Sequence, residues 1–155
     1  MKKGFTLIEL LVVIGIIGIM TSVGLVSINE SRKSKELEIE TRRVVAVIRE
    51  AQNNAFSGKN ADVCDYWRFR YNVDDNDRKF RIRGVGDSSC NQLIYDYEIN
   101  SKNIRFTGRW TGVEFYFPNG ETNPPIPEDI QLCRRDKSEE CLKIIVSSSG
   151  NIKIE

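Results

Sequence analysis

The feature that most constrains this chain is an apolar run near its N-terminus, at residues 5–28. These twenty-four residues contain a single charged side chain, Glu9. As a helix with a rise of about 1.5 Å per residue, the run reaches about 36 Å, which is enough to cross a bilayer with some tilt. A carboxylate in hydrocarbon costs roughly 2.5–3.5 kcal/mol on insertion scales, so Glu9 requires a specific explanation.

The remainder of the chain is large enough for one globular domain. The chain has 155 residues, with 23 basic and 22 acidic side chains and a formal net charge of +1. This balance gives no overall attraction to nucleic acid or to anionic lipid. The sequence has no histidine, which excludes Ser-His-Asp and Cys-His catalytic sites. We expect a protein without catalytic residues or cofactors, and a membrane-anchored extracytoplasmic enzyme is the least favoured alternative.

Two ordinary interpretations of the N-terminus are open. The run can be a plain membrane anchor. It can also be a secretory signal, with Lys2 and Lys3 as the basic region, residues 10–20 as the apolar region and residues 22–24 as a small-x-small cleavage site. Glu9 counts against the secretory signal, because it lies where an uninterrupted apolar stretch is needed.

A third interpretation accounts for the lysines, the glycine and the glutamate together. The segment GFTLIELLVVIGIIGI, which begins at Gly4, resembles the start of type IV pilins and type II secretion pseudopilins. The resemblance implies a leader at residues 1–4, cleavage after Gly4 and N-methylation of Phe5 by a prepilin peptidase/N-methyltransferase. It implies a single-pass protein of the bacterial inner membrane, in contact with membrane lipid, with its head in the periplasm or extracytoplasmic space. Its further partners would be other pilin or pseudopilin subunits and the inner-membrane assembly platform.

The physical chemistry of Glu9 agrees with this resemblance. Cleavage before Phe5 removes Lys2 and Lys3 and creates a free ammonium four residues from the carboxylate. A buried charge is tolerated when it is paired. Glu9 is therefore predicted to pair with the Phe5 ammonium of a neighbouring subunit and to set the register of assembly. The alternative is a glutamate that extends to the cytoplasmic interface of a simple anchor.

Helical periodicity continues beyond the apolar run. One stripe of a helix would hold Leu37, Val44, Ile48, Ala51 and Ala55. Ser57-Gly58 is a suitable C-terminal stop. We therefore predict one helix over residues 5–57, with a transmembrane part at about 5–28. Many pilins have a proline where this chain has Val26, which leaves the continuity of the helix open at that point.

From residue 58 the hydrophobic pattern changes to a period of two, which is typical of strands. The predicted strands are residues 65–72, 79–84, 93–99, 103–107, 113–117, 130–133, 142–147 and 151–155. Asn119-Gly120 and Gly150-Asn151 indicate turns. The predicted fold class is α+β and pilin-like, with one long N-terminal helix packed against an antiparallel β-sheet head at residues 58–155.

The C-terminal half narrows the resemblance. Its segments VEFYFPNGET, IQLC and LKIIVSSSGNIKIE resemble the corresponding half of GspH/FimT-type minor pilins and pseudopilins. This implies a low-abundance subunit that primes or caps a type IV pilus or a type II secretion pseudopilus. Secretion, motility and DNA uptake are all compatible with such a subunit.

Arginines alternate with core positions in the first two predicted strands. These arginines are Arg68, Arg70, Arg81 and Arg83, with Arg105 further along. They would form a basic face if their strands pair, and the resemblance makes them candidate DNA contacts, because some FimT-like proteins bind DNA for uptake. Those proteins use basic residues at the C-terminal turn, where this chain has only Lys153. We therefore favour a solvated face in which Asp96 and Glu98 pair with arginines across strands.

Four cysteines lie beyond the apolar run, and this even number indicates an oxidising compartment. They are Cys64, Cys90, Cys133 and Cys141. Of the three possible pairings we predict 64–90 and 133–141, because one pair brackets the first arginine-bearing hairpin and the other flanks a polar connection. Their spacing matches no zinc site. The acidic residues 74–77 lack the glycine and closing glutamate of a calcium loop, so we predict a polar turn and no metal.

Overall fold

One long helix, α1 (Leu7–Phe56), precedes the strands of the chain. The computed structural model describes residues 6–71, 77–107, 112–122 and 130–155, without the side chains of residues 22–27 and 92. The helix is continuous at Val26. It ends in a left-handed residue, Gly58 (φ +64°), and the Lys59 amide donates to the Asn54 carbonyl at 3.0 Å. This end is a glycine-terminated cap of the kind that the Ser57-Gly58 sequence predicts.

The chain divides into two compact units, Met1–Glu36 and Leu37–Glu155. The first unit contains the N-terminal part of α1, where apolar side chains such as Leu7 (83% exposed) and Met20 (73% exposed) face outward. Within the part of the chain that the structure describes, no helix has the length and hydropathy required to cross a membrane. The transmembrane part predicted at about 5–28 is therefore not confirmed.

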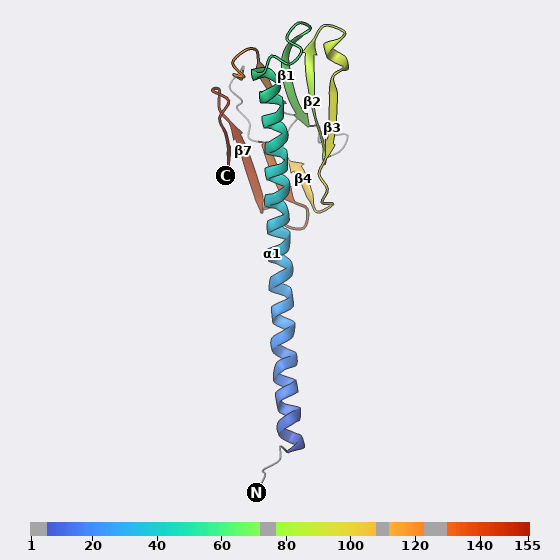
Figure 1. The fold of residues 1–155 in the computed structure, drawn as a ribbon. Helices are drawn as coiled ribbons and strands as arrows, with labels where there is room; N and C mark the ends of the chain where they lie inside the picture. Colours follow the sequence, from blue (N-terminus) through green and yellow to red (C-terminus); the bar gives the residue numbers. More distant parts are fainter. Residues whose placement is uncertain (1–5, 72–76, 108–111, 123–129) are drawn as a thin grey trace. The chain divides into compact units, whose positions relative to one another are not determined.

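In the second unit, the eight described strands form two four-stranded antiparallel sheets (Figure 1). Sheet A, in the order β3-β2-β1-β5, consists of β1 (Cys64–Tyr71), β2 (Lys79–Gly86), β3 (Ile94–Glu98) and β5 (Gly112–Tyr116). Sheet B, in the order β4-β6-β7-β8, consists of β4 (Ile104–Thr107), β6 (Ile130–Arg134), β7 (Cys141–Val146) and β8 (Ile152–Ile154). A short 3₁₀ helix, η1 (Cys90–Gln92), lies between β2 and β3. Each strand predicted from alternation overlaps one of these strands.

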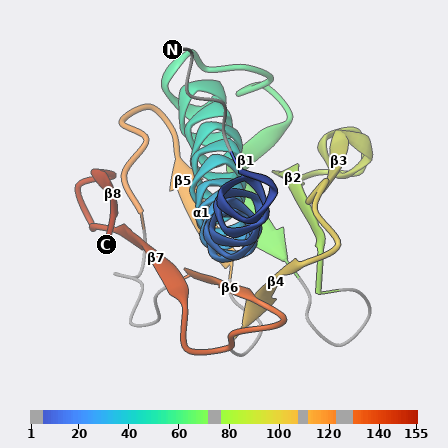
Figure 2. The ribbon, with the colours of Figure 1, turned by 90° about the horizontal axis from the view of Figure 1, so that it is seen from below.

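The head part of α1 shares one hydrophobic core with both sheets. Ile48 of α1, Phe69 of β1 and Phe106 of β4 are all fully buried in it. Tyr71 of β1 stacks on Phe106 with the ring centroids 4.4 Å apart, and this contact joins the two sheets. Strands of both sheets flank the part of α1 from Leu37 onward (Figure 2). The burial of each large apolar side chain stabilises the fold by about 1.5–3 kcal/mol. One long helix packed on antiparallel sheets confirms the predicted fold class.

Candidate assembly segment and arginine face

Glu9 lies in the first turn of α1 and is hydrogen-bonded within its own chain. The backbone amide of Thr6 donates to Glu9 Oε2 at 2.9 Å, and the Thr6 hydroxyl donates to the same oxygen at 2.8 Å. In return, the Glu9 amide donates to Thr6 Oγ1 at 3.4 Å. This reciprocal pattern is a capping box, which satisfies amides that the start of a helix leaves without partners.

The capping role of Thr6 was not predicted from the sequence. The capping-box signature, a threonine followed three residues later by a glutamate, is legible in Thr6-Leu7-Ile8-Glu9. Gly4 and Phe5, the predicted cleavage and methylation residues, lie outside the described residues. The assembly role of Glu9 stays a prediction, and the structure adds that its carboxylate already has a defined partner in the same chain.

Four of the five predicted arginines meet on the outer face of sheet A. Arg68 is directly opposite Arg83, and Arg70 is directly opposite Arg81, where β1 pairs with β2. These four residues are called the arginine face below. Arg105 would join them only if its strand paired with β1 or β2, and this condition is not met, because β4 pairs with β6 in sheet B.

Acceptors at the margins of sheet A hold three of these side chains. Arg68 forms an ion pair with Glu114 of β5, in which its Nε is 2.9 Å from Oε1. Arg81 Nε is 3.1 Å from an oxygen of Asp96 on β3. Arg83 Nη2 donates to Asn91 Oδ1 at 3.0 Å. The predicted cross-strand pairing is thus present for Asp96, while Glu98 pairs with Arg78, outside the arginine face.

Arg70 is half-buried and lies within range of the charges of the other three arginines. Burial and, after it, the charges of Arg68, Arg83 and Arg81 lower the pKa of Arg70 from its ordinary value. The residue opposite Arg70 on β5 is Gly112. The guanidinium remains charged, because arginine stays protonated in proteins.

Two tyrosines adjoin the arginine face along the strand direction. Tyr66 of β1 and Tyr116 of β5 lie side by side, with ring centroids 4.8 Å apart. The guanidinium of Arg68 lies 5.3 Å from the Tyr66 ring centroid, within cation–π range. The Tyr116 hydroxyl donates to Glu114 at 2.8 Å. Burial, followed by this hydrogen bond, raises the pKa of Tyr116 to about 12.

The structure pairs the cysteines as predicted. Cys64 is bonded to Cys90, and Cys133 is bonded to Cys141. The second disulfide joins residues that face each other directly across β6 and β7. On the chain-entropy model the longer and shorter loops contribute about 3.5 and about 2.5 kcal/mol, respectively.

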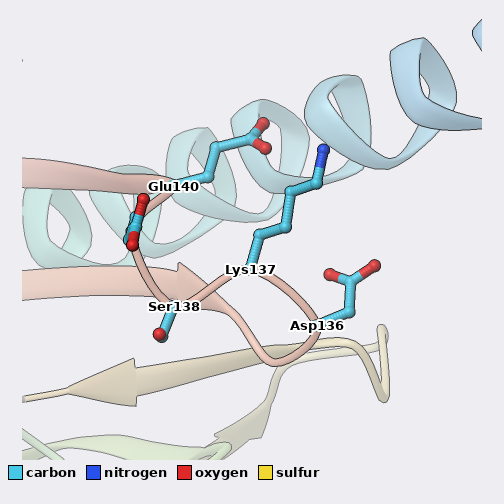
Figure 3. Close-up of a pocket in the computed structure, with 5 residues that line it drawn as sticks. Asp136, Lys137, Ser138 and Glu140 are labelled. Atoms are coloured by element: carbon cyan, nitrogen blue, oxygen red, sulfur yellow. The ribbon is translucent and has the colours of Figure 1, made fainter.

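The connection between β6 and β7 is fixed by ion pairs. Arg134, only 1% exposed, donates through Nε and Nη2 to Asp136 at 2.9 and 2.8 Å, and through Nη1 to Glu140 at 2.7 Å. A shallow hollow is lined by residues 136–140, with Lys137 and Glu140 extending to the same side of the loop in Figure 3. Both acidic partners of Arg134 belong to this lining, so they hold the loop together and do not present a vacant cation site.

The acidic stretch at residues 74–77, predicted to be a polar turn, lies mostly outside the described residues. Of the acidic residues 74–77, only Asp77 is described, and both its carboxylate oxygens are 2.5 Å from Nη2 of Arg135. The described residues contain no group of three or more potential metal ligands. Lys153 is exposed on β8, across from Ile145, and is separate from the arginine face on sheet A.

Comparison with known proteins gives matches for the N-terminal segment and for the fold. Residues 1–25 match the family model described as the prokaryotic N-terminal methylation motif. A crystal structure of the type IV minor pilin FimU from Pseudomonas aeruginosa (strain PAO1) in space group P21 shares the fold. Its TM-score is 0.58 at 17% identity, over 79% of this chain and 90% of that one. The chain therefore has a pilin-like fold and carries the N-terminal methylation motif.

A second FimU structure, in space group P65, matches the fold of this chain to a similar degree. The TM-score is 0.56 at 18% identity, over 77% of this chain and 92% of that one. No curated protein matches the chain. At this level of identity the FimU structures establish the fold of the pilin-like protein, and the methylation motif is an independent observation on its sequence.

Proposed function

We propose that this pilin-like protein is a minor pilin or pseudopilin, a structural subunit that primes or caps a type IV pilus or a type II secretion pseudopilus. One combination carries the proposal, namely an N-terminal methylation motif at residues 1–25 on a chain whose head has a pilin-like fold. The two disulfides are compatible with a head in an oxidising, extracytoplasmic compartment.

In the proposed pathway the precursor is held in the inner membrane by residues 5–28. A prepilin peptidase cuts after Gly4, which removes two lysines and creates an ammonium at the new N-terminus. The same enzyme methylates Phe5. The ammonium of an incoming subunit then pairs with Glu9 of its neighbour, because a charge in an apolar helix bundle is stable only when it is paired. Assembly is thereby limited to processed subunits.

Mass spectrometry of the intact protein from producing cells tests the processing step. We expect a mature chain that begins at Phe5 and carries one added methyl group. Gly4→Leu should leave the precursor uncut, because the larger side chain obstructs the peptidase pocket. Gly18→Leu is the matched control: a Cβ at Gly18 meets nothing within 4 Å, so processing should be normal. A mature N-terminus at Leu25 would reject the proposal and restore the secretory signal.

DNA binding for uptake is a second candidate function, favoured by a single observation. The four arginines do gather on one face of sheet A. Against it, residues 150–153 at the C-terminal turn supply only Lys153, and the whole chain has a net charge of +1. Because each phosphate contact adds about one unit to the salt dependence of binding, a duplex-binding assay at two salt concentrations separates this function from a purely structural one.

A further inference from the structure

Arg134 places a positive charge at a core position of sheet B. Along β6, Ile130 and Leu132 are buried, and Arg134 follows them on the same face of the strand, because successive side chains alternate. Arg134 is 1% exposed and lies directly opposite Ile104, a core residue of β4. A buried charge that loses its partners is strongly destabilising, whereas an apolar side chain of similar volume carries no such risk. The presence of arginine here therefore needs a reason other than packing.

The connection that follows β6 compensates this charge. Three N–H groups of the guanidinium donate to Asp136 and Glu140, which lie two and six residues further along the chain. The side chains of these two acids are 38% and 35% exposed, and both belong to the loop in Figure 3. If the loop changed shape, water would solvate the carboxylates, but the arginine, which is shielded from water, would lose three charge-assisted hydrogen bonds. The compensation is thus tied to one conformation of residues 135–140.

The Cys133–Cys141 disulfide closes this connection at its base. The two cysteines form the last registered pair of β6 and β7, and Arg134 and Glu140 come directly after them toward the loop. The Arg134 amide donates to the Glu140 carbonyl at 3.1 Å, and the Glu140 amide donates to the Lys137 carbonyl at 3.0 Å. Local opening at the ends of elements ordinarily costs little free energy. A covalent bond at the last pair prevents the strand ends from separating and so keeps the carboxylates within reach of the guanidinium.

The second disulfide lies in a different environment. Cys64–Cys90 packs on Gly84, where a Cβ would lie 2.5 Å from Cys90 Sγ and 2.9 Å from Cys64 Sγ. Among the residues that the structure describes, Arg134 is the one lysine or arginine that is buried. A buried cation beside a disulfide is therefore particular to the β6–β7 connection.

We propose that Arg134 makes the stability of the head conditional on the oxidation of Cys133 and Cys141, so that the β6–β7 connection is a redox-sensitive element of the fold. In the reduced chain the strand ends separate, the carboxylates move into water and the guanidinium loses their compensation. Oxidation is a thiol–disulfide exchange, in which the two thiols form the S–S bond and a disulfide of the oxidant is reduced to two thiols. This dependence is a property of the single chain and does not rest on the proposed function. Its consequence is a head that completes its fold in an oxidising compartment.

A double-mutant cycle on the full chain in detergent, followed by thermal unfolding, tests the proposal. Cys133→Ser with Cys141→Ser removes the disulfide, and Arg134→Met removes the charge while an unbranched apolar side chain fills the core position. In the Arg134→Met background, loop entropy alone should lower Tm by about 10 °C when the disulfide is removed. With Arg134 present, the decrease should be at least about 15 °C.

Arg135→Met is the matched control for the charge. Arg135 is the next residue along the chain, and its side chain is 42% exposed. Removal of its charge should leave the decrease in Tm as large as it is in the wild-type background, because exposed ion pairs contribute little. A reduced decrease in the Arg135→Met background would overturn the assignment to the buried charge.

The outcomes of the cycle decide the proposal in each case. Folding of the serine variant only when Arg134→Met is also present would support it strongly. Equal decreases in Tm in the two backgrounds would overturn it, because the disulfide would then act through loop entropy alone. Failure of the serine variant to fold in either background would also overturn it, because the fold would then require the disulfide whether or not the charge is present.

Amide hydrogen exchange places the effect in the structure. In the chain with Cys133→Ser and Cys141→Ser, the amides of Arg134 and Glu140 should exchange at least about tenfold faster than in the oxidised chain. Arg134→Met should restore most of this protection. Exchange at these two amides that is equally fast with and without the charge would contradict the proposal.

Discussion

The turn between β7 and β8 depends on one glycine, and replacing it with alanine gives a worked prediction. Gly150 has φ +78° and lies against α1, where Gln52 Nε2 donates to its carbonyl at 2.9 Å. A Cβ at this position would lie 2.3 Å from Gln52 Nε2 and 3.0 Å from the Gly120 carbonyl oxygen. Gly150→Ala therefore combines backbone strain with a steric conflict at the helix.

The magnitude follows from three contributions. A left-handed conformation costs an L-residue about 1–2 kcal/mol. The Gln52 amide is the far end of a flexible side chain, so it can rotate away at the cost of its hydrogen bond, about 1 kcal/mol. Alanine restricts the unfolded chain more than glycine does, and this offsets the loss of folding stability by about 0.5 kcal/mol. The sum is a loss of about 2 kcal/mol, or a decrease of about 8 °C in Tm for a head of this size.

The assay is thermal unfolding of the mature chain in detergent, followed by near-ultraviolet circular dichroism of the buried aromatic side chains. Gln52→Ala should cost about 1 kcal/mol by itself. The double variant with Gly150→Ala should cost about 2 kcal/mol, no more than Gly150→Ala alone, because the hydrogen bond is lost in both. Additive losses of about 3 kcal/mol, or a neutral Gly150→Ala, would refute the proposed coupling between the turn and α1.

Two further predictions concern Glu9 of α1 and Tyr97 of β3. Glu9→Val should leave processing intact but lower incorporation into filaments at least about tenfold. Thr6→Val removes the capping hydroxyl, costs about 1 kcal/mol of helix stability and should lower incorporation far less than Glu9→Val does. Equal filament content for Glu9→Val and wild type would contradict this prediction. Burial and the hydrogen bond to Glu50 raise the pKa of Tyr97 to about 12. Because the folded pKa lies above the unfolded value of about 10, this contribution to stability is full below pH 10 and is lost as the pH rises through 12. Tyr97→Phe should therefore reduce the alkaline loss of stability measured by denaturant titration, and part of the loss should remain because the pKa of Tyr116 is raised similarly. An unchanged loss in Tyr97→Phe would contradict the prediction.

Local patterns were sufficient to predict the elements of this fold, but they did not predict which strands pair. Alternation placed Trp67 and Phe69 in the core and their neighbouring arginines outside, because successive side chains of a strand point to opposite faces. The same alternation cannot say which sheet a strand joins. Arg105 has the correct parity for an outer face, yet its strand β4 pairs with β6, more than twenty residues along the chain. Such distant pairings depend on the packing of the whole core.

The site was predictable to a similar degree. Residue types were enough to single out Glu9 and the four arginines, and hairpin connectivity was enough to pair the cysteines. The position of Arg134 was not predictable, because a charged residue at the end of a strand normally faces water. It is buried because Asp136 and Glu140 lie close enough to bind all three guanidinium nitrogens, which depends on the shape of the loop.

The capping box also bears on how one carboxylate can serve both the helix and assembly. Both hydrogen bonds from Thr6 go to Oε2 of Glu9. An ionised carboxylate offers about four acceptor positions, so Oε1 retains the capacity to accept from an ammonium. Because the cap fixes the rotamer of Glu9 in the isolated subunit, less conformational entropy is lost when the partner binds. In the proposed pathway, the same contacts that begin α1 therefore hold the carboxylate ready for the processed N-terminus of the next subunit.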